Sequence, residues 1–308
     1  MSCAATATMA LVVSVAAGLV AADQTIRVGV DLVNFGVVVT DKRGTPISGL
    51  TREDFEVLER GKPQQVRFFS AADTALAPPL HLGFLLDASG SMEDDIKDVR
   101  TAAIKFLNKN EYAKDVTLVD FDTQVRLTHY DADDYAKIIE HIRMRKAEGM
   151  TAFYDALGVY LRNAFEKDGQ KVLVVYTDGG DTRSVTTSQE VVELLKASDV
   201  TVYMLGYLEH QGSSYRVGAQ MEMQRFSNMT GGQAFFPTSI KQLDGMYDKI
   251  LTEMSARYVL GYTSSDDKPD GTWRQVEIKL KRPDLKGAKL RTRPGYYAPL
   301  IKSSAPSR

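Results

Sequence analysis

The sequence predicts an α/β fold, with a doubly wound, mostly parallel sheet covered by helices on both faces and a small β subdomain made from the two ends of the chain. Residues 81–86 are a near-continuous apolar run, which is typical of a strand buried on both faces of a parallel sheet. In residues 96–108, apolar side chains recur at the spacing of an amphipathic helix. Because strand and helix patterns alternate up to residue 256, we expect one α/β domain over residues 80–256.

The expected elements of this domain follow one another closely. Residues 124–128 come so soon after the strand at 116–121 that the two should pair antiparallel, at an edge of the sheet. The expected strands are 81–87, 116–121, 124–128, 171–177, 201–207 and 234–236, and the expected helices are 96–108, 133–143, 152–166, 188–198, 217–228 and 239–254.

The segments on either side of this domain have β patterns. Residues 26–40 alternate apolar and polar side chains, residues 51–54 predict one capped helical turn, and residues 258–262 and 276–281 return to alternation. Because a pair of strands is only marginally stable alone, we expect both ends of the chain to form one subdomain. The expected segments are an N-terminal β extension (23–70), a linker (71–79), the α/β domain (80–256), a C-terminal β extension (257–299) and a tail (300–308).

The N-terminus has the pattern of a secretory signal. Residues 1–22 contain no Asp, Glu, Lys or Arg, and residues 9–20 are apolar, with small residues before Asp23. The apolar run is shorter than the roughly 20 residues that cross a bilayer. We therefore expect an exported protein, periplasmic or secreted after cleavage of this signal peptide, and the alternative is an N-terminal membrane anchor. The single cysteine, Cys3, precedes the apolar run, so the mature chain should have no disulfide and no thiolate metal site.

The composition argues against several classes of function. The 308 residues carry a formal net charge of -2 and no cluster of Lys and Arg with interleaved aromatics, so we expect no nucleic-acid partner. The glycine-rich patterns that bind nucleotide phosphates do not occur. The four histidines are scattered and none lies in an HExxH motif or a nucleophile elbow.

Polar side chains gather where strands of the α/β domain end. Asp87 closes the first strand, and Ser89 and Ser91 follow it in a glycine-containing loop. Thr151 lies in a loop that enters a helix, and Asp178 follows a later strand. Because ligand-binding groups of an open parallel sheet meet at the carboxyl ends of its strands, these three loops can converge.

The ligand types predict a divalent-cation site. Two carboxylates and three hydroxyls offer hard oxygens, which favour Mg²⁺, and Mn²⁺ or Ca²⁺ as alternatives, over zinc or copper. Neutral hydroxyls leave the cation electrophilic, so that an Asp or Glu carboxylate from a partner protein can complete its coordination. The alternative is that the two aspartates only cap helices or accept loop amides.

At these residues the sequence resembles a known family. Asp87-Ala88-Ser89-Gly90-Ser91, with Thr151 and Asp178, is similar to the metal-ion-dependent adhesion site (MIDAS) of the von Willebrand factor type A (VWA) domain. The resemblance covers residues 80–256 and implies a Rossmann-like fold. It also implies that the metal is contacted by the hydroxyls of Ser89, Ser91 and Thr151, and by the two aspartates directly or through water.

The flanking segments carry a second resemblance. Residues 39–44, 49–55, 258–262 and 294–297 resemble the extensions of exported bacterial proteins in the VWFA-related acidobacterial group. This wider resemblance extends to nearly the full mature chain and adds architecture more than function.

Four further acids lie near the predicted site. In integrin β-subunit domains, which carry a similar loop, acids at the positions of Asp94 and Asp95 help to hold a second calcium ion. The alternative is that both acids complement the dipole of the helix that begins there. Behind the ligands, Asp155 would orient the Thr151 loop and Asp181 would cap the next helix.

These observations predict an exported, metal-dependent protein-interaction module of the adhesion type and not an enzyme, with association with the cell envelope as a wider expectation. One alternative is a metal-dependent hydrolase that uses the same ion to activate water, which would need a general base or nucleophile beside the metal. A second alternative is a structural component of the envelope.

Overall fold

The computed structural model describes residues 32–71, 74–110, 113–178, 180–209 and 211–300. The expected signal peptide at 1–22 and the first part of the expected strand at 26–40 lie outside these residues. Within the described ranges, no helix combines the length and apolar character that crossing a bilayer requires.

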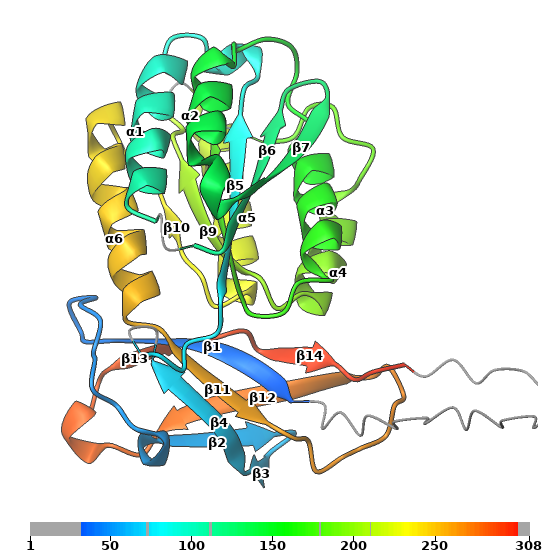
Figure 1. Cartoon of the computed structure of the whole chain (residues 1–308). Helices are drawn as coiled ribbons and strands as arrows, with labels where there is room; N and C mark the ends of the chain where they lie inside the picture. The colour runs from blue at the N-terminus through cyan, green and yellow to red at the C-terminus, as the bar shows by residue number, and fades with distance from the viewer. Residues whose placement is uncertain (1–31, 72–73, 111–112, 179, 210, 301–308) are drawn as a thin grey trace, which may run out of the picture. The chain divides into compact units, whose positions relative to one another are not determined.

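A six-stranded sheet forms the centre of the α/β domain (Figure 1). Its strand order is β10-β9-β8-β5-β6-β7, and neighbouring strands are parallel except for β6 and β7. The antiparallel edge strand is confirmed, because the short turn 122–124 between β6 and β7 leaves no room for a crossover. The strands are β5 (Leu80–Asp87), β6 (Asp115–Phe121), β7 (Val125–Asp131), β8 (Gln170–Thr177), β9 (Thr201–Gly206) and β10 (Ala234–Phe235).

Helices cover both faces of this sheet, as the sequence predicts. Buried side chains of α1, α2 and α6 pack on one face, and those of α3, α4 and α5 pack on the other. The central strands are therefore buried on both sides, which explains their continuous apolar sequence. The helices are α1 (Ile96–Asn108), α2 (Tyr135–Met144), α3 (Phe153–Ala164), α4 (Ser188–Ala197), α5 (Ser213–Met229) and α6 (Leu243–Ser255), and short 3-10 turns are η1 (Arg52–Asp54), η2 (Gly90–Met92), η3 (Ala132–Asp134), η4 (Ile240–Gln242) and η5 (Pro283–Leu285).

The remaining strands form a β subdomain in which the two ends of the chain interleave. One sheet has the order β13-β1-β11-β4 and the other β14-β12-β2-β3, so each contains strands from before and after the α/β domain. An apolar core that includes Phe35, Val57 and Leu260 lies between the two sheets. The strands are β1 (Val33–Thr40), β2 (Phe55–Glu59), β3 (Lys62–Gln64), β4 (Val66–Ala71), β11 (Tyr258–Tyr262), β12 (Trp273–Leu280), β13 (Lys289–Arg291) and β14 (Gly295–Tyr297).

A buried acid ties the two sheets together. Glu59, on β2, accepts hydrogen bonds from the hydroxyls of Tyr262 (2.8 Å), Tyr296 (2.9 Å) and Ser264 (2.7 Å). The guanidinium of Arg274, itself buried, lies 3.6 Å from the same carboxylate. A charge buried in this way is tolerated because hydrogen bonds and an opposite charge replace its water.

The α/β domain is inserted between two neighbouring strands of this subdomain. β4 ends at Ala71 and β11 begins at Tyr258, and these two residues pair with each other across the antiparallel strands. The chain therefore leaves the subdomain and returns to it at the same place.

Two helices differ by four residues from their predictions at the N-terminal end. α6 begins at Leu243 and not at residue 239, because the 3-10 turn η4 occupies residues 240–242, and α5 begins earlier than predicted. α5 begins at Ser213, after Gly212 in extended conformation, whereas the apolar spacing predicts a start at residue 217. The first buried residue of α5 is Met223, so its opening turns bury no apolar face from which periodicity could be recognised.

Candidate metal centre

The first loop of the predicted site is built around a buried carboxylate. Asp87 ends β5 and is fully buried. Its Oδ1 accepts the backbone N–H of Ser89 at 2.9 Å, and its Oδ2 accepts the Thr177 hydroxyl at 2.6 Å. The hydroxyl oxygens of Ser89 and Ser91 lie 3.1 Å apart. Three of the predicted ligand side chains, those of Asp87, Ser89 and Ser91, are therefore grouped at the carboxyl end of one strand.

Backbone hydrogen bonds attach the second loop to the first. The N–H of Gly90 donates to the carbonyl of Gly149 at 3.0 Å, and the N–H of Glu148 donates to the carbonyl of Ala88 at 2.8 Å. Gly149 has a φ of +78°, and a Cβ there would lie 2.5 Å from the Thr123 hydroxyl, so the position requires glycine. The loop that carries Thr151 is thereby fixed against the loop that follows β5.

The third loop is attached to Thr151 in the same way. The N–H of Thr151 donates to the Thr182 hydroxyl at 3.0 Å, and the Thr151 carbonyl accepts the N–H groups of Thr182 (2.9 Å) and Arg183 (3.1 Å). Asp178, at the start of this loop, is buried, and so is Thr151. The structure thus brings together the three loops that carry the predicted ligands.

The electrostatics of these loops favour a cation. Burial, and then the nearby charge of Asp178, raise the pKa of Asp87 to about 7, although hydrogen bonds from Ser89 and Thr177 act in the opposite direction. Two buried carboxylates that repel each other are stabilised by an ion of opposite charge. Together with the hydroxyls of Ser89 and Ser91, they form a donor set of hard oxygens that fits Mg²⁺, Mn²⁺ or Ca²⁺.

Asp181 caps a different helix from the one expected. The sequence suggests that it caps the next helix, α4, but α4 is capped by Thr187, whose hydroxyl accepts the N–H of Glu190. Asp181 instead accepts the backbone N–H of Tyr154 in the first turn of α3, at 3.0 Å. The expectation is therefore wrong for a tertiary reason: the first turn of α3 follows Ala152, which offers no capping side chain, and Asp181 reaches it from another loop.

Asp155, which is expected from the sequence to orient the Thr151 loop, contacts the third loop instead. Its carboxylate accepts the backbone N–H groups of Thr186 at 2.9 Å and Val185 at 3.1 Å. Burial alone would raise the pKa of Asp155, but hydrogen bonds from Thr186 and Val185 hold it below its ordinary value. The two acids behind the site, Asp155 and Asp181, therefore fasten residues 181–186 to the start of α3.

Asp94 and Asp95 lie between η2 and α1. Asp94 is exposed, Asp95 is half-buried, and neither side chain caps α1 by a hydrogen bond. Among the residues that the structure describes, no group of three or more His, Cys, Asp or Glu side chains is arranged to hold a metal. The main predicted site is of another kind, since hydroxyls make up most of its predicted ligands. Both the main ion and a second ion at Asp94 and Asp95 stay predictions.

An arginine that the sequence pattern does not reveal supports the second loop. Arg145 pairs with Asp120 at 2.7 Å and also with Asp122, both buried at the end of β6. The carbonyl of Asp122 accepts the N–H of Ala152, next to Thr151, at 2.9 Å. A single arginine among many surface charges gives no sequence signal, because its partners are distant in the chain.

Two residues that the sequence pattern does not reveal hold the third loop. Gln211 donates its side-chain N–H to the carbonyl of Asp178 at 3.1 Å. The hydroxyl of Tyr215, in the first turn of α5, accepts the N–H of Gly180 at 2.6 Å. Both residues lie where the sequence shows no helical periodicity, so nothing in the pattern marks them.

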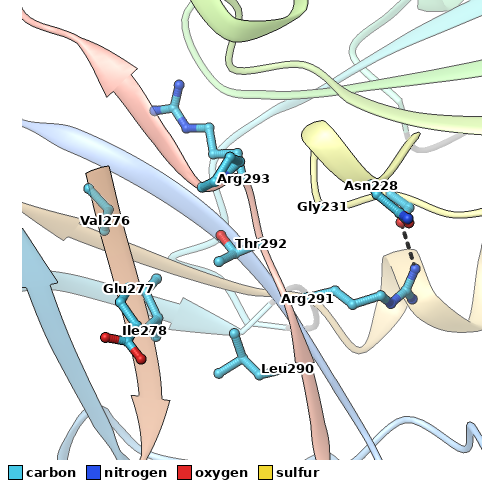
Figure 2. Close-up of a pocket in the computed structure, with 11 residues that line it drawn as sticks. Asn228, Gly231, Val276, Glu277, Ile278, Leu290, Arg291, Thr292 and Arg293 are labelled. Carbon is cyan, nitrogen blue, oxygen red and sulfur yellow. Dashed lines mark hydrogen bonds between the residues drawn. The ribbon is translucent and has the colours of Figure 1, made fainter. Parts of the chain in front are cut away.

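A cavity of about 340 Å³ lies elsewhere, between the end of α5 and strands β12 and β13 (Figure 2). In Figure 2 the Arg291 side chain extends toward the end of α5, where it donates to the carbonyl of Gly232 at 2.9 Å. The same guanidinium pairs with Glu253 at 2.5 Å. The guanidinium of Arg291 thus already has protein partners and is not free to bind an anion. This cavity is therefore a weaker candidate for a binding site than the three loops of the predicted metal centre.

Comparisons with known proteins agree with this architecture. Residues 81–249 match the family model for the von Willebrand factor type A domain. No curated protein matches the chain.

Three solved structures are similar in fold. A von Willebrand factor type A protein from Catenulispora acidiphila is 13% identical, with 74% of this chain and 68% of that chain covered and a TM-score of 0.48. The pilus adhesin SpaC from Lactobacillus rhamnosus GG, in its open conformation, is 12% identical, with 82% and 49% covered and a TM-score of 0.50. Proximal thread matrix protein 1 from the mussel byssus, with a zinc-occupied MIDAS motif, is 18% identical, with 58% and 48% covered and a TM-score of 0.47. This chain thus spans about half the length of the last two proteins.

Proposed function

Because the chain belongs to the von Willebrand factor type A domain family, as its match over residues 81–249 shows, we propose that it is a protein-interaction module that binds a partner's carboxylate through a divalent cation. The proposed ligands are the hydroxyls of Ser89, Ser91 and Thr151 and the carboxylates of Asp87 and Asp178.

The observation that carries the proposal is the burial of Asp87 beside Asp178. Both side chains are almost without solvent contact, and the pKa of Asp87 is raised to about 7 by burial and by the Asp178 charge. An arrangement of this kind is costly for folding alone and is typical of a functional site. A bound cation would offset the repulsion between the two buried carboxylates, and the adjacent serine hydroxyls would supply neutral oxygen ligands.

The chain's own residues would determine what happens at the site. Ser89, Ser91 and Thr151 would hold the ion without neutralising it, because hydroxyls carry no charge. Asp155 and Asp181 would keep the third loop against the start of α3, so that the ligands are in place before a partner arrives. When bound, the cation supplies an electrophilic centre with a position for an external acid.

Magnesium is the proposed ion, with manganese or calcium as alternatives, and the proposed role is binding and not catalysis. Export through the N-terminal signal is part of the proposal, since an adhesion-type module acts outside the cytoplasm. The identity of the ion, the binding role and export are independent of one another. The experiment below tests the ion and the binding role.

The experiment uses Mn²⁺ as a probe, because the water relaxation that it causes reports both binding and coordinated water. We expect the full chain to bind one Mn²⁺, competed by Mg²⁺, and excess acetate to lower the relaxation enhancement by displacing water. Acetamide, which has the same shape but no charge, should have no effect.

Variants make this test specific. Asp87→Ala and Asp178→Ala should abolish Mn²⁺ binding, whereas Asp248→Ala, which removes an exposed acid paired with Lys109, should not. Binding that survives in Asp87→Ala would overturn the metal site, and an equal response to acetate and acetamide would overturn the carboxylate mechanism.

A further inference from the structure

We propose that Tyr215 and Met150 form an apolar rim beside the metal centre, and that this rim selects a partner segment whose metal-binding carboxylate is flanked by a large apolar side chain. The inference rests on the proposed function and specifies the class of partner.

Tyr215 is an exposed aromatic ring in a fixed position. Its side chain lies in the first turn of α5 and the residue is 43% exposed. Its hydroxyl accepts the backbone N–H of Gly180 at 2.6 Å, two residues after Asp178. The ring is therefore anchored to the loop that carries a proposed ligand while part of its surface stays open to solvent.

The contact between Tyr215 and Gly180 is closely fitted. A Cβ at Gly180 would lie 2.7 Å from the tyrosine hydroxyl, so a larger residue there would displace the ring or the loop. Gln211, four residues before Tyr215, bonds the carbonyl of Asp178 at 3.1 Å. Two hydrogen bonds thus fix the start of α5 against the third metal loop.

Met150 provides a second exposed apolar side chain, on the second metal loop. It directly precedes Thr151 and is 56% exposed. Its N–H donates to the Thr123 hydroxyl at 2.9 Å, so the backbone that carries the side chain is held in place. An unbranched, polarizable side chain of this kind adapts to partners of different shape.

The charged residues near the loops give no comparable selectivity. The exposed charges are of both signs: Glu93 and Asp94 follow the first loop, Lys146 and Glu148 lie on the second, and Arg183 lies on the third. A partner segment is therefore selected for one carboxylate, which complements the cation, and for apolar neighbours, which contact Tyr215 and Met150. Aromatic and methionine side chains are enriched in interfaces for the same reason.

The test uses an array of immobilised peptides of the form Gly-Xaa-Asp-Xaa-Gly, in which each Xaa is Leu, Phe, Ser, Lys or Glu. The full chain is applied in Mg²⁺ and, separately, in chelator. We expect Mg²⁺-dependent binding that favours Leu or Phe over Ser beside the aspartate by about tenfold, which corresponds to 1.4 kcal/mol.

Three variants assign the preference to the rim. Met150→Ala should reduce the preference for Leu and Phe several-fold without changing Mn²⁺ binding. Tyr215→Ala should reduce the preference as well, measured at a Mg²⁺ concentration that saturates the variant, because this change also removes the hydrogen bond to Gly180. Phe165→Ala is the matched control, because Phe165 is 61% exposed but follows α3 at the end away from Thr151, about 18 Å along the helix. It should leave both the preference and the metal binding unchanged.

The outcomes separate the rim from the metal mechanism. Mg²⁺-dependent binding with equal signals for Leu- and Ser-flanked peptides would overturn the rim and leave the proposed function standing. A preference for Leu and Phe that persists in chelator would overturn both the metal mechanism and the rim, because the rim is proposed to select a segment that is bound through the metal. Equal loss of preference in Phe165→Ala would also overturn the rim.

Discussion

The hydroxyl of Thr177, at the end of β8, donates a 2.6 Å hydrogen bond to Oδ2 of Asp87, at the end of the neighbouring strand β5. We expect Thr177→Val to lower the free energy of unfolding by about 1–3 kcal/mol, because it leaves a buried carboxylate oxygen with one donor fewer. Urea denaturation measures the change. Thr177→Ser keeps the hydroxyl and should cost less, and equal losses in both variants would show that the methyl group matters and the hydrogen bond does not.

Asp87→Asn should have opposite effects on stability with and without metal. In chelator we expect a higher melting temperature than in the native chain, because the amide removes the buried repulsion with Asp178. In Mg²⁺ the native chain should gain about 2.7 kcal/mol at a metal concentration 100 times its dissociation constant, and the variant should gain nothing. Thermal melts in both buffers decide this, and a variant that still responds to Mg²⁺ would contradict it.

Asp155 should make stability depend on acid pH. Its pKa is lowered in the folded chain by hydrogen bonds from Thr186 and Val185, despite the opposing effect of burial. The folded state thus binds fewer protons, so the stabilisation is complete above the ordinary value of 3.8 and is lost as pH falls through the lower folded value.

The measurement is the difference in unfolding free energy between the native chain and Asp155→Asn. We expect about 1–3 kcal/mol at neutral pH, shrinking toward zero below the ordinary pKa of the carboxyl group. A difference that does not change with pH would mean that the charge of Asp155 contributes nothing to the loop.

Glu59→Gln should destabilise the β subdomain. The amide keeps the shape of the side chain but leaves the buried Arg274 without the acid 3.6 Å away. Because Arg274 keeps a second acid, Asp266, at 3.8 Å, we expect a loss of about 1–3 kcal/mol, measured by thermal unfolding. Glu56→Gln, on the same strand but only half-buried, is the control, and Mn²⁺ binding should be unchanged in both variants.

The sequence was sufficient for the α/β fold because its signals are local. The apolar strand ending at Asp87 and the amphipathic pattern of residues 96–108 each predict one element without reference to the rest of the chain. The turn at 122–124 likewise predicts the antiparallel edge strand, since so few residues allow only a hairpin.

The sequence was insufficient where two distant segments share one hydrogen bond. Asp181 caps α3 from 27 residues away, and Gly180 bonds to Tyr215 from 35 residues away. No periodicity records such pairs, and Asp, Gly and Tyr are common in loops and helix ends. The division of the β subdomain into two interleaved sheets could not be predicted for the same reason, because its strands pair across long distances in the chain. For example, Val37 on β1 pairs with Tyr258 on β11.

The pairing of Ala71 with Tyr258 has a mechanical consequence. Tension applied between residues 32 and 300 acts first on the antiparallel strand pairs of the β subdomain, because the α/β domain is inserted at a single residue pair. As long as Ala71 and Tyr258 stay paired, the force passes from strand to strand within the β subdomain and does not act on the inserted domain. The loops of Asp87, Thr151 and Asp178 would then keep their geometry while the ends of the chain are pulled apart.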